Sequence, residues 1–557
     1  MQTDLLVWFL VATVLAFFMQ CGFTMVETGF IRAKNVGNII MKNFADFCIG
    51  AIAFLVIGYS ILQSSAYFSG IIGVPNFDLL QNFSGFLSSD QSRSFVIDIV
   101  YCTTAVTIVS GAMAERTKFG AYCIYSIVMS ALVYPIEAGW VLNSQGWLNN
   151  LGFTDCAGSC TIHMVGGITA LIGAWFVGPR TDKYRKDPKK GVIANAIPGH
   201  AIPLAALGCF ILWFGWYGFN GASASSAEEL VRILIVTTLA PAAAMISCMI
   251  FTWWKSGHPD VSMCLNAVIA GLVSVTAGCA YVDAAGAVII GAVSGVLVVV
   301  GVELIEKKLH VDDPVGAIAV HGINGLWGTF AVGLFDTQLG LFYSGTFNLL
   351  LVQLLGILAI GAFTAVCMII TFFLIKKFVG LRVTREDEIV GLDMSEHSLP
   401  TVYADFQMAA PVYDVEDEFD LDLDNLKPVQ ITDASERKGE RYTKITIICN
   451  DSKFGVLKDA MAAIGVTGMT VSNVVGCGVQ KGRTGRYRGV RMSMNLLPKL
   501  KVDIVVSTVD PGLVVAVAQR ALYSGNVGDG KIFVTDVTDV MRVRTGSMGK
   551  KALNDED

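Results

Sequence analysis

The sequence predicts an all-α membrane domain of eleven transmembrane helices, followed by a smaller soluble domain of mixed helices and strands. Composition is the first observation behind this fold class. Of the 557 residues, 54% are hydrophobic and 15% are charged, whereas a soluble protein is usually about 25% charged. The second observation is that the long apolar segments lie in residues 1–379, while residues 380–557 have an ordinary soluble composition. The chain therefore divides into a membrane part and a soluble part.

The membrane part contains eleven segments that are long enough to cross a bilayer, which takes about 20 mainly apolar residues. They are 5–30, 36–62, 94–114, 119–142, 159–178, 198–220, 228–252, 261–280, 283–305, 316–335 and 347–376. The first segment lacks a basic region before it and is long enough to span, so we expect a helix that stays in the membrane rather than a cleaved signal.

Basic residues gather in alternate connections between these segments. Those connections hold Arg32, Lys34, Arg116, Lys118, Arg180, Lys183, Arg185, Lys186, Lys189, Lys190, Lys255, Lys307 and Lys308. Because cytoplasmic loops carry the excess of Lys and Arg, this distribution predicts an N-terminus outside and a C-terminal domain in the cytosol. The net charge of −6 gives no indication of a nucleic-acid partner.

Two segments share one spacing of aspartate, glycine and histidine. The residues that carry it are Asp155, Gly158, His163 and Gly167 in the first segment and Asp313, Gly316, His321 and Gly325 in the second. Five spans separate the two, and an odd offset reverses the direction through the bilayer. This pattern predicts inverted five-helix repeats, with a functional site where the repeats meet.

A histidine inside a span is expensive unless it has a partner or a cavity. Matching positions for His163 and His321 favour one shared site, and the alternative is two unrelated histidines satisfied by backbone carbonyls. A neutral histidine pair can share a hydrogen bond and pass a proton. It can also bind a small polar solute in a narrow apolar lumen.

Several longer segments resemble the Amt/Mep/Rh ammonium transporter family. They are GFTMVETGFIRAKN (22–35), DCAGSCTIHMVGG (155–167), GWYGFNGASA (215–224), DDPVGAIAVHGINGLWG (312–328) and the tail GLRVTREDEIVGLDMSEHS (380–398). The resemblance covers about residues 5–398. It implies an eleven-helix protomer in the plasma membrane, a homotrimer, one pore in each protomer, and ammonium or ammonia as the substrate.

The resemblance also implies roles for residues of this chain. His163 and His321 would be the paired pore histidines, and Asp155 a buried support below the outer vestibule. Ser223 would belong to the external ammonium site, and Phe219 would be one of two stacked gate rings. Without the resemblance, Asp155 would be interpreted as a helix cap and Phe219 as core packing.

Two positions depart from the family pattern. Tyr101 stands where the second gate phenylalanine is usual, so it adds a hydroxyl to an apolar constriction. Leu142 or Asn143 stands where many bacterial members have a tryptophan over the bound cation, and Trp140 is nearby. We therefore expect an altered outer cation site above an unaltered histidine pair.

The implied chemistry suits these residues. Ammonium and potassium are similar in size and charge, so the fit of the ion cannot separate them. An outer vestibule can bind ammonium through hydroxyl oxygens and aromatic faces. Deprotonation then lets neutral ammonia cross an apolar lumen, which potassium cannot enter without losing its hydration. Such transport requires no cofactor.

The soluble part begins with an expected cytosolic tail at 380–410 and an acidic linker at 411–440. Seven acids and no base lie between Asp414 and Asp424, which is typical of solvated, disordered chain. The domain 441–557 follows. Its strand-like segments at 443–449, 501–507 and 531–537 alternate with helix-like segments near 453–464 and 511–523, and this order predicts a ferredoxin-like βαββαβ unit.

Five segments of this domain resemble the PII signalling family. They are GVTGMTV (465–471), GCGVQKGRTGRYRG (476–489), LLPKLKVDIVV (496–506), GDGKIFV (528–534) and RVRTG (542–546). The resemblance implies ATP or ADP as ligands between three subunits, with 2-oxoglutarate bound through Mg-ATP. It also implies a mobile T-loop, in which Met492 replaces the tyrosine that uridylylated members carry.

Glycine amides that approach phosphates, and basic side chains beside them, form the candidate nucleotide site. Its residues are Thr470, Gly528, Asp529, Gly530, Lys531, Arg542 and Arg544. By resemblance, Gln480 would coordinate the magnesium of Mg-ATP, and Lys499 would pair with 2-oxoglutarate. The T-loop would include Lys481, Arg486, Tyr487 and Arg488.

Three functions remain open at this point. The first is an ammonium transporter that its own PII domain gates in cis, because both families form trimers and tethering raises the effective concentration to roughly millimolar. The second is an ammonium sensor with little or no flux. The third is a channel for another small solute such as carbon dioxide. No nucleophile and base are paired in the sequence in a way that indicates an enzyme.

Overall fold

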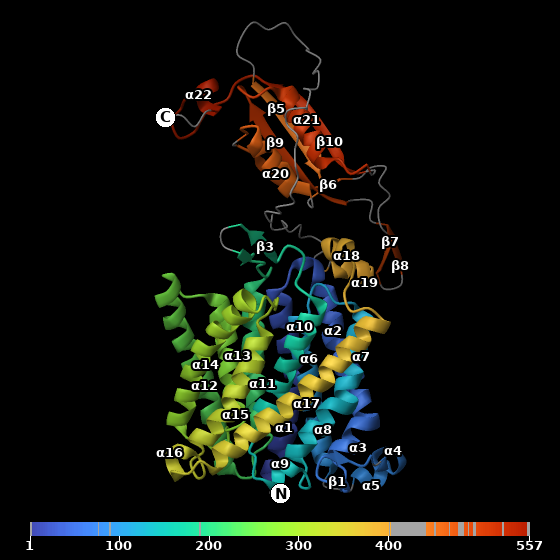
Figure 1. Ribbon diagram of the computed structural model, residues 1–557, viewed down its shortest axis with the longest axis vertical. Helices are drawn as coiled ribbons and strands as arrows, with labels where there is room; N and C mark the ends of the chain where they lie inside the picture. The colour runs from blue at the N-terminus through green and yellow to red at the C-terminus, as the bar shows by residue number, and fades with distance from the viewer. Residues whose placement is uncertain are drawn as a thin grey trace. The chain divides into compact units, whose positions relative to one another are not determined.

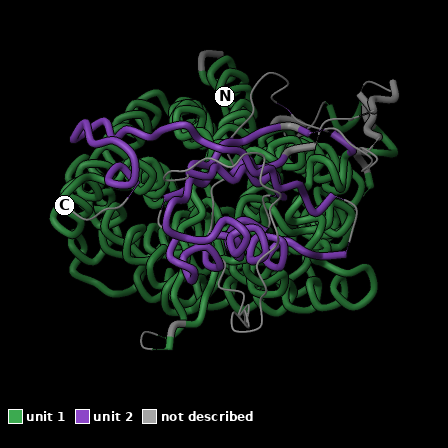
Figure 2. The backbone as a smooth tube through the Cα atoms, turned by 90° about the horizontal axis from the view of Figure 1, so that it is seen from above, with its two compact units in different colours: residues 1–397 green, residues 398–557 purple. Residues whose placement is uncertain are grey.

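The computed structural model forms two compact units, residues 1–397 and residues 398–557 (Figures 1 and 2). The described residues are 3–75, 77–87, 91–188, 191–399, 402, 442–450, 453–466, 468–476, 484–487, 490–493, 497–525 and 528–553. The predicted acidic linker at 411–440 lies outside them. Each unit is described by itself.

Long apolar helices make up the first unit. Among the described residues, ten helical stretches are long and apolar enough to cross a membrane: Leu5–Phe30, Ala33–Leu62, Ser94–Ala112, Phe119–Asn150, Ser159–Val177, Ile202–Gly221, Ala227–Ser256, Ala284–Lys308, Ile318–Phe335 and Asn348–Phe378. The predicted span at 261–280 corresponds to α13 (Val261–Thr276), whose 16 residues are fewer than the usual crossing length.

Several of these stretches join helices of different type. Their component helices are α1 (Thr3–Phe30), α2 (Val36–Ala53), α3 (Tyr59–Leu62), α6 (Gln91–Ala112), α7 (Phe119–Val128), α8 (Tyr134–Leu142), α9 (Trp147–Asn150), α10 (Val165–Val177), α11 (Ile202–Gly221), α12 (Ala227–Ser256), α14 (Ala284–Glu303), α15 (Asn324–Phe335) and α17 (Asn348–Phe378). The π-helical turns between or beside them are Phe54–Gly58, Met129–Val133, Ser159–Met164, Leu304–Lys308 and Ile318–Ile323.

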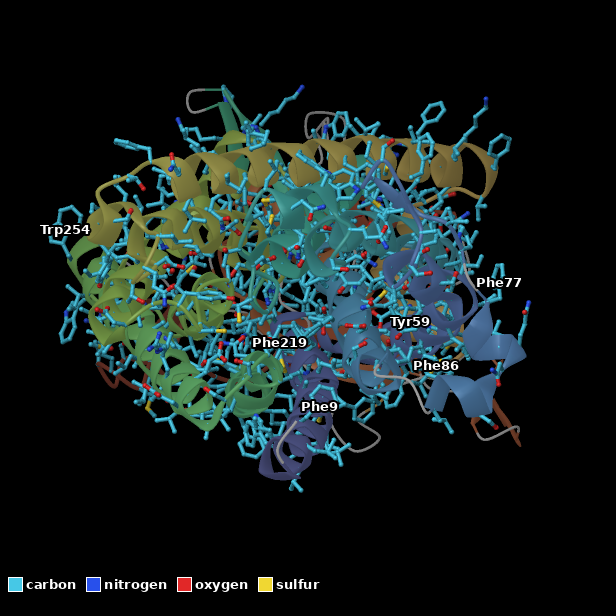
Figure 3. The ribbon with its side chains drawn as sticks, turned by 90° about the horizontal axis from the view of Figure 1, so that it is seen from below. Phe9, Tyr59, Phe77, Phe86, Phe219 and Trp254 are labelled. Atoms are coloured by element: carbon cyan, nitrogen blue, oxygen red, sulfur yellow. The ribbon has the colours of Figure 1, made fainter. Side chains whose placement is uncertain are left out.

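Small residues allow the helices of this unit to approach closely. A Cβ atom at Gly29 of α1 would lie 2.5 Å from the Ala205 nitrogen of α11, and one at Gly208 of α11 would lie 2.5 Å from the Val26 nitrogen. The rim of the bundle is apolar in contrast: Trp254 projects from it and is 80% exposed (Figure 3). An apolar rim around a tightly packed interior is what a bilayer requires, and the chain is a multi-pass membrane protein.

The two ends of the first unit differ. Figure 1 shows the N-terminus, α9 and α16 (Leu341–Ser344) at one end and β3 (Tyr184–Asp187), α18 (Arg385–Val390) and α19 (Leu392–His397) at the other. The tail helices are fixed to that second end by hydrogen bonds. Glu388 accepts one from the Thr181 nitrogen, and Asp393 accepts one from the Asn38 nitrogen at 2.8 Å.

The second unit contains a four-stranded antiparallel sheet in the order β10-β5-β9-β6. Its elements are β5 (Tyr442–Cys449), α20 (Phe454–Ala463), β6 (Thr470–Gly476), β7 (Thr484–Tyr487), β8 (Val490–Ser493), β9 (Leu497–Val506), α21 (Pro511–Leu522), β10 (Gly530–Val537) and α22 (Lys550–Leu553). Ile445, Ile447 and Cys449 alternate along β5 and pack against Leu457 of α20 and Val517 of α21. This alternation buries one face of the sheet.

Candidate functional site

Each predicted histidine segment turns through a glycine and then a π-helix of six residues. Gly158 has a φ of 103° and Gly316 a φ of 82°, a left-handed conformation that favours glycine. His163 lies in the π-helix Ser159–Met164 and His321 in the π-helix Ile318–Ile323. The repeated spacing therefore produces the same local structure twice.

The aspartate of each segment holds this turn by accepting hydrogen bonds from backbone nitrogens. Asp155 accepts from Gly158, Cys160 and Thr161 at 3.2, 3.1 and 2.9 Å, and from the Thr161 hydroxyl at 3.0 Å. Asp313 accepts from Val315, Gly316 and Ile318 at 3.3, 3.0 and 2.8 Å. Both residues thus act as caps for amides that the start of a helix leaves free.

The last glycine of each pattern brings the two segments into contact. A Cβ atom at Gly167 would lie 2.1 Å from the Gly322 nitrogen, and one at Gly325 would lie 2.5 Å from the Ser159 oxygen. Each segment therefore packs its glycine against the backbone of the other. This reciprocal contact explains how two histidines 158 residues apart meet.

His163 and His321 form a hydrogen-bonded pair. Their Nδ1 atoms are 3.2 Å apart, and their rings lie 5.2 Å apart with an interplanar angle of 25°. One Nδ1 must carry the hydrogen and the other must accept it, so the pair is compatible with two neutral rings of opposite tautomer. Both rings are buried, and Nε2 of His163 has no hydrogen-bond partner in the described part of the chain.

Trp216 of α11 supports the pair, although the sequence did not predict it as a site residue. Its ring stacks on His163 at 5.1 Å and 23°, and its indole nitrogen donates to the Thr276 hydroxyl at 2.8 Å. Trp216 precedes Phe219 by three residues, so both lie on one helix face. That spacing is the signal that could have identified it.

Tyr101 and Phe219 form an aromatic layer next to the histidines. Their ring centres are 4.7 Å apart with an angle of 70°, and Phe219 is 5.9 Å from His163. Figure 3 shows Phe219 inside the bundle, away from its rim. The Tyr101 hydroxyl donates to the Phe219 carbonyl oxygen at 2.9 Å, so the phenol that departs from the expected phenylalanine is bonded to the other residue of the aromatic layer.

The two remaining outer candidates occupy different places. Ser223 donates to the Cys156 carbonyl oxygen at 3.0 Å and also interacts with the Tyr101 hydroxyl, so it lies beside the aromatic layer. Trp140 packs against Trp147 and Phe363 at 5.7 and 5.0 Å, and its indole nitrogen donates to the Ile71 carbonyl oxygen. The contacts of Trp140 are therefore with α9, α17 and the loop at Ile71.

A small cavity lies on the other side of the pair, where His321 faces it. Its volume is about 20 Å³, enough for one water molecule. The lining is mostly apolar, and Glu27 and Asn266 are its polar members besides His321. The site thus consists of an aromatic layer, the histidine pair and an inner cavity.

An ion-pair network anchors the start of the second histidine segment. Arg180 donates to Asp312 at 2.8 and 2.9 Å and to Glu115 at 3.2 Å, and Arg32 also pairs with Glu115. Burial would raise the pKa of Glu115, but Arg32 and Arg180 lower that pKa to about 2. Burial would also raise the pKa of Asp312, but Arg180 and Arg116 hold that pKa below its ordinary value.

The second unit brings some of its predicted residues together. Lys499 donates to the Gly528 carbonyl oxygen at 2.8 Å, and Gly528 and Gly530 have φ values of 112° and 133°. Asp529 accepts hydrogen bonds from Ser524, which hold the pKa of Asp529 below its ordinary value. The predicted 2-oxoglutarate lysine therefore lies against the predicted phosphate loop.

The other predicted residues of this unit lie in the strands, in the turn after β10, or outside the described residues. Lys531 follows the loop in β10, Thr470 starts β6, and Arg542 and Arg544 lie in the turn after β10. Arg486 and Tyr487 lie in β7. Gln480, Lys481 and Arg488 lie outside the described residues.

The first unit is thus a multi-pass membrane protein with a buried histidine pair next to an aromatic layer. The comparison with family models is specific: the Ammonium Transporter Family matches residues 7–402, and the nitrogen regulatory protein P-II matches residues 442–547. The chain belongs to the Ammonium Transporter Family and carries a PII domain.

Named relatives and solved structures agree with this assignment. Ammonium transporter Amt2 of Archaeoglobus fulgidus is 40% identical over 416 residues, covering 70% of this chain and 86% of that protein. Ammonium transporter 3 of Dictyostelium discoideum is 35% identical, covering 70% of this chain and 92% of that protein. A solved structure named Sensor Amt Protein is 35% identical with a TM-score of 0.66, covering 70% of this chain and 98% of that one.

Proposed function

We propose that this protein is an ammonium transporter whose flux is regulated in cis by its PII domain. The observation that carries the proposal is the contact between His163 and His321, two buried rings whose Nδ1 atoms lie 3.2 Å apart. Ammonium is recruited at the outer face by the hydroxyl oxygens of Ser223 and Tyr101 and by the aromatic rings. Ammonium then loses the proton that Nε2 of His163 accepts, and neutral ammonia continues past the gate into the apolar lumen.

The histidine pair carries the proton separately. A proton that arrives at Nε2 of His163 releases the hydrogen on Nδ1, which moves to Nδ1 of His321, and His321 then releases a proton from its own Nε2. The free Nε2 of His163 supports this direction, because no described residue competes for it. Each ring must return to its first tautomer before the next proton passes. The net result is electrogenic transport of one positive charge for each ammonia.

The architecture in the membrane follows the family. We infer that α13 completes eleven crossings and that the two histidine segments belong to inverted repeats. The shared turns at Gly158 and Gly316 and the reciprocal packing of Gly167 and Gly325 support this inference. The N-terminus is outside, the PII domain is cytosolic, and the protein is a plasma-membrane homotrimer with one pore in each protomer.

The PII domain supplies regulation through small-molecule ligands. Its Gly528–Gly530 turn suits phosphates, because two glycines with positive φ leave the backbone open to close approach. Lys499 donates to the Gly528 carbonyl oxygen, and Lys531 directly follows Gly530. ATP or ADP would bind there, with Arg542 and Arg544 as further basic groups, and 2-oxoglutarate would bind through magnesium at Gln480. A T-loop with Arg486 and Arg488 would then enter or leave the cytosolic mouth of the pore.

A second candidate is an ammonium sensor with little flux. Two observations favour it: a structural neighbour is named a sensor Amt protein, and the Tyr101 hydroxyl is bonded across the gate to Phe219. If the protein is a sensor, ammonium binding to the membrane domain changes the PII domain while little or no ammonium crosses the membrane.

Ammonium-evoked current in proteoliposomes tests the proposal, with solid-supported-membrane electrophysiology as the measurement. We expect a saturable current that His163→Ala abolishes and that ATP, ADP or 2-oxoglutarate alters. Trp175→Leu, at the exposed rim of the bundle, is the matched control and retains the current. If no current is seen in any nucleotide state while ammonium still changes the protease sensitivity of the PII domain, the protein is not a transporter and the sensor function is supported.

A further inference from the structure

Glu27 of α1 lies on the side of the histidine pair away from the aromatic gate. Its side chain lines the same small cavity as His321, and the rest of that lining is apolar apart from Asn266. The cavity has room for one small molecule. A residue with a carboxyl group therefore lies at the cavity on the His321 side of the pair.

The carboxyl group is held in place by helices α2 and α6. The Ser110 hydroxyl donates to Oε2 at 2.7 Å, and the Asn43 amide donates to the same atom at 3.1 Å. A Cβ atom at position 111 would lie 3.2 Å from Oε1, so Gly111 leaves room for the second oxygen. The side chain is 3% exposed, and its position is fixed by these contacts.

Further polar groups continue from Glu27 between α2 and α6. Lys42 is fully buried, interacts electrostatically with Glu27, and has no hydrogen-bond partner for Nζ in the described ranges. Asp46 accepts from the Tyr122 hydroxyl at 2.8 Å and from Thr107 at 3.2 Å. Buried charge in a membrane domain is expensive and usually functional, and the cluster begins at the cavity.

We propose that Glu27 is a catalytic group of the transport cycle, the acid that returns the proton to ammonia in the inner cavity. This inference rests on the proposed function. Glu27 receives the proton that leaves Nε2 of His321. Ammonia then takes it through the nitrogen lone pair: the O–H bond of Glu27 breaks, the new N–H bond of ammonium forms, and the carboxylate remains as the counter-ion. The next proton from the histidine pair restores the acid.

A structural role is the alternative, because Glu27 also connects three helices through Ser110 and Asn43. Glutamine separates the two roles. Glu27→Gln keeps the size of the side chain and an oxygen that accepts those hydrogen bonds, but it cannot carry a proton. Thr24→Val is the matched control, since Thr24 is a buried residue of the same helix whose hydroxyl donates to the Gln20 carbonyl oxygen.

Currents from the full-length protein in proteoliposomes give the first measurement. We expect Glu27→Gln to lower the ammonium current on the order of 100-fold, the scale of a general acid, with an unchanged thermal unfolding midpoint. Thr24→Val keeps both the current and the midpoint. A Glu27→Gln protein with the wild-type current overturns the proposal.

Infrared difference spectroscopy gives a second measurement that does not depend on flux. Adding ammonium to the wild-type protein is expected to change a band of protonated carboxyl groups that Glu27→Gln lacks. Ser110→Ala removes one hydrogen bond to Oε2 and is expected to shift that band, which assigns it even where Glu27→Gln does not fold. A wild-type spectrum without such a change overturns the role of Glu27.

The two measurements separate the two failures. Absence of any wild-type current defeats the proposed transport function, and the infrared band then still decides whether Glu27 exchanges a proton with ammonium. A wild-type current without a Glu27-dependent band defeats only the role of Glu27.

Discussion

The two histidine segments have the same local structure and different surroundings. Each has an aspartate cap, a glycine with positive φ and a six-residue π-helix. The first segment faces aromatic rings, because His163 stacks on Trp216 and lies near Phe219. The second faces a cavity that Glu27 also lines. One repeated sequence pattern thus positions two chemically equal rings, and the neighbours of each ring make its side of the pair different.

The anchors before the two aspartates differ in the same way. Thr154, before Asp155, exchanges hydrogen bonds with the neutral Gln353 at 2.9 and 2.7 Å. Asp312, before Asp313, pairs with the charged Arg180. The first segment is therefore held by an amide and the second by an ion pair. Substitutions at these positions test how far the two segments are equivalent.

The largest expected effect comes from Gly167→Ala, which breaks the contact between the segments. The added Cβ atom would lie 2.1 Å from the Gly322 nitrogen, and backbone cannot yield at that distance. We expect almost no folded protein, measured as the monodisperse yield after extraction in detergent. Gly120→Ala is the control, because a Cβ atom there meets nothing within 4 Å; equal yields for both variants would contradict the close contact.

Loss of the charged anchor is the next largest effect. Arg180→Ala leaves Asp312 and Glu115 buried without this partner, and breaking a buried ion pair costs about 3–5 kcal/mol. Gln353→Ala, the neutral counterpart, is expected to cost about 1–3 kcal/mol. Thermal unfolding in detergent checks the order. A larger loss of stability for Gln353→Ala would show that charge does not distinguish the two anchors.

A single hydroxyl distinguishes the two aspartate caps. Thr161 donates to Asp155, whereas Ala319 occupies the corresponding position of the second segment. Thr161→Val keeps the shape, removes that bond to a carboxylate, and is expected to cost about 1.5–3 kcal/mol of stability. Thr161→Ser keeps the hydroxyl and serves as the control. The idea fails if the valine and serine variants unfold at the same temperature.

The smallest expected effect is the dependence of stability on pH that comes from Glu115. The pKa of Glu115 is lowered from 4.5 to about 2, so its contribution to stability is complete above pH 4.5 and is lost as the pH falls toward about 2. Between pH 8 and pH 5 we expect the contribution of Glu115 to stability to stay constant. The unfolding temperatures of Glu115→Gln and of the wild-type protein, plotted against pH, should therefore run parallel in that range. The curves should converge below pH 4.5, and divergence with acidification would be the contradictory result.

The sequence predicted the histidine pair because the same spacing of aspartate, glycine and histidine occurs twice, each time in or next to a recognisable membrane span. It did not predict Trp216, Gln353 or Glu27, because their roles depend on which face of a helix meets a segment far away in the chain. Trp140 illustrates the same limit: its place in the sequence near Leu142 and Asn143 does not indicate that its ring packs against Trp147 and Phe363. Nor does local sequence reveal a π-helix, whose extra residue in each turn is set by tertiary contacts.

In the soluble domain, the order of strands and helices could be predicted from the hydrophobic periodicity and the length of the segments. The proximity of Lys499 to Gly528 could not, because it joins the start of β9 to a loop 29 residues further along. Strand pairing between β5 and both β9 and β10 brings these positions together. Pairing partners are a property of the whole sheet, and no single segment of sequence specifies them.

The hydrogen bond from Tyr101 to the Phe219 carbonyl oxygen has a consequence for timing. A phenylalanine ring at this position could rotate without breaking a hydrogen bond, whereas the Tyr101 ring must first break its bond to the Phe219 carbonyl oxygen. A cost of about 1 kcal/mol lowers the fraction of time that the Tyr101 ring spends away from Phe219 about fivefold. In the transport cycle proposed above, a Tyr101 ring that leaves the aromatic layer less often slows turnover, and an ammonium ion at the outer face waits longer before it passes.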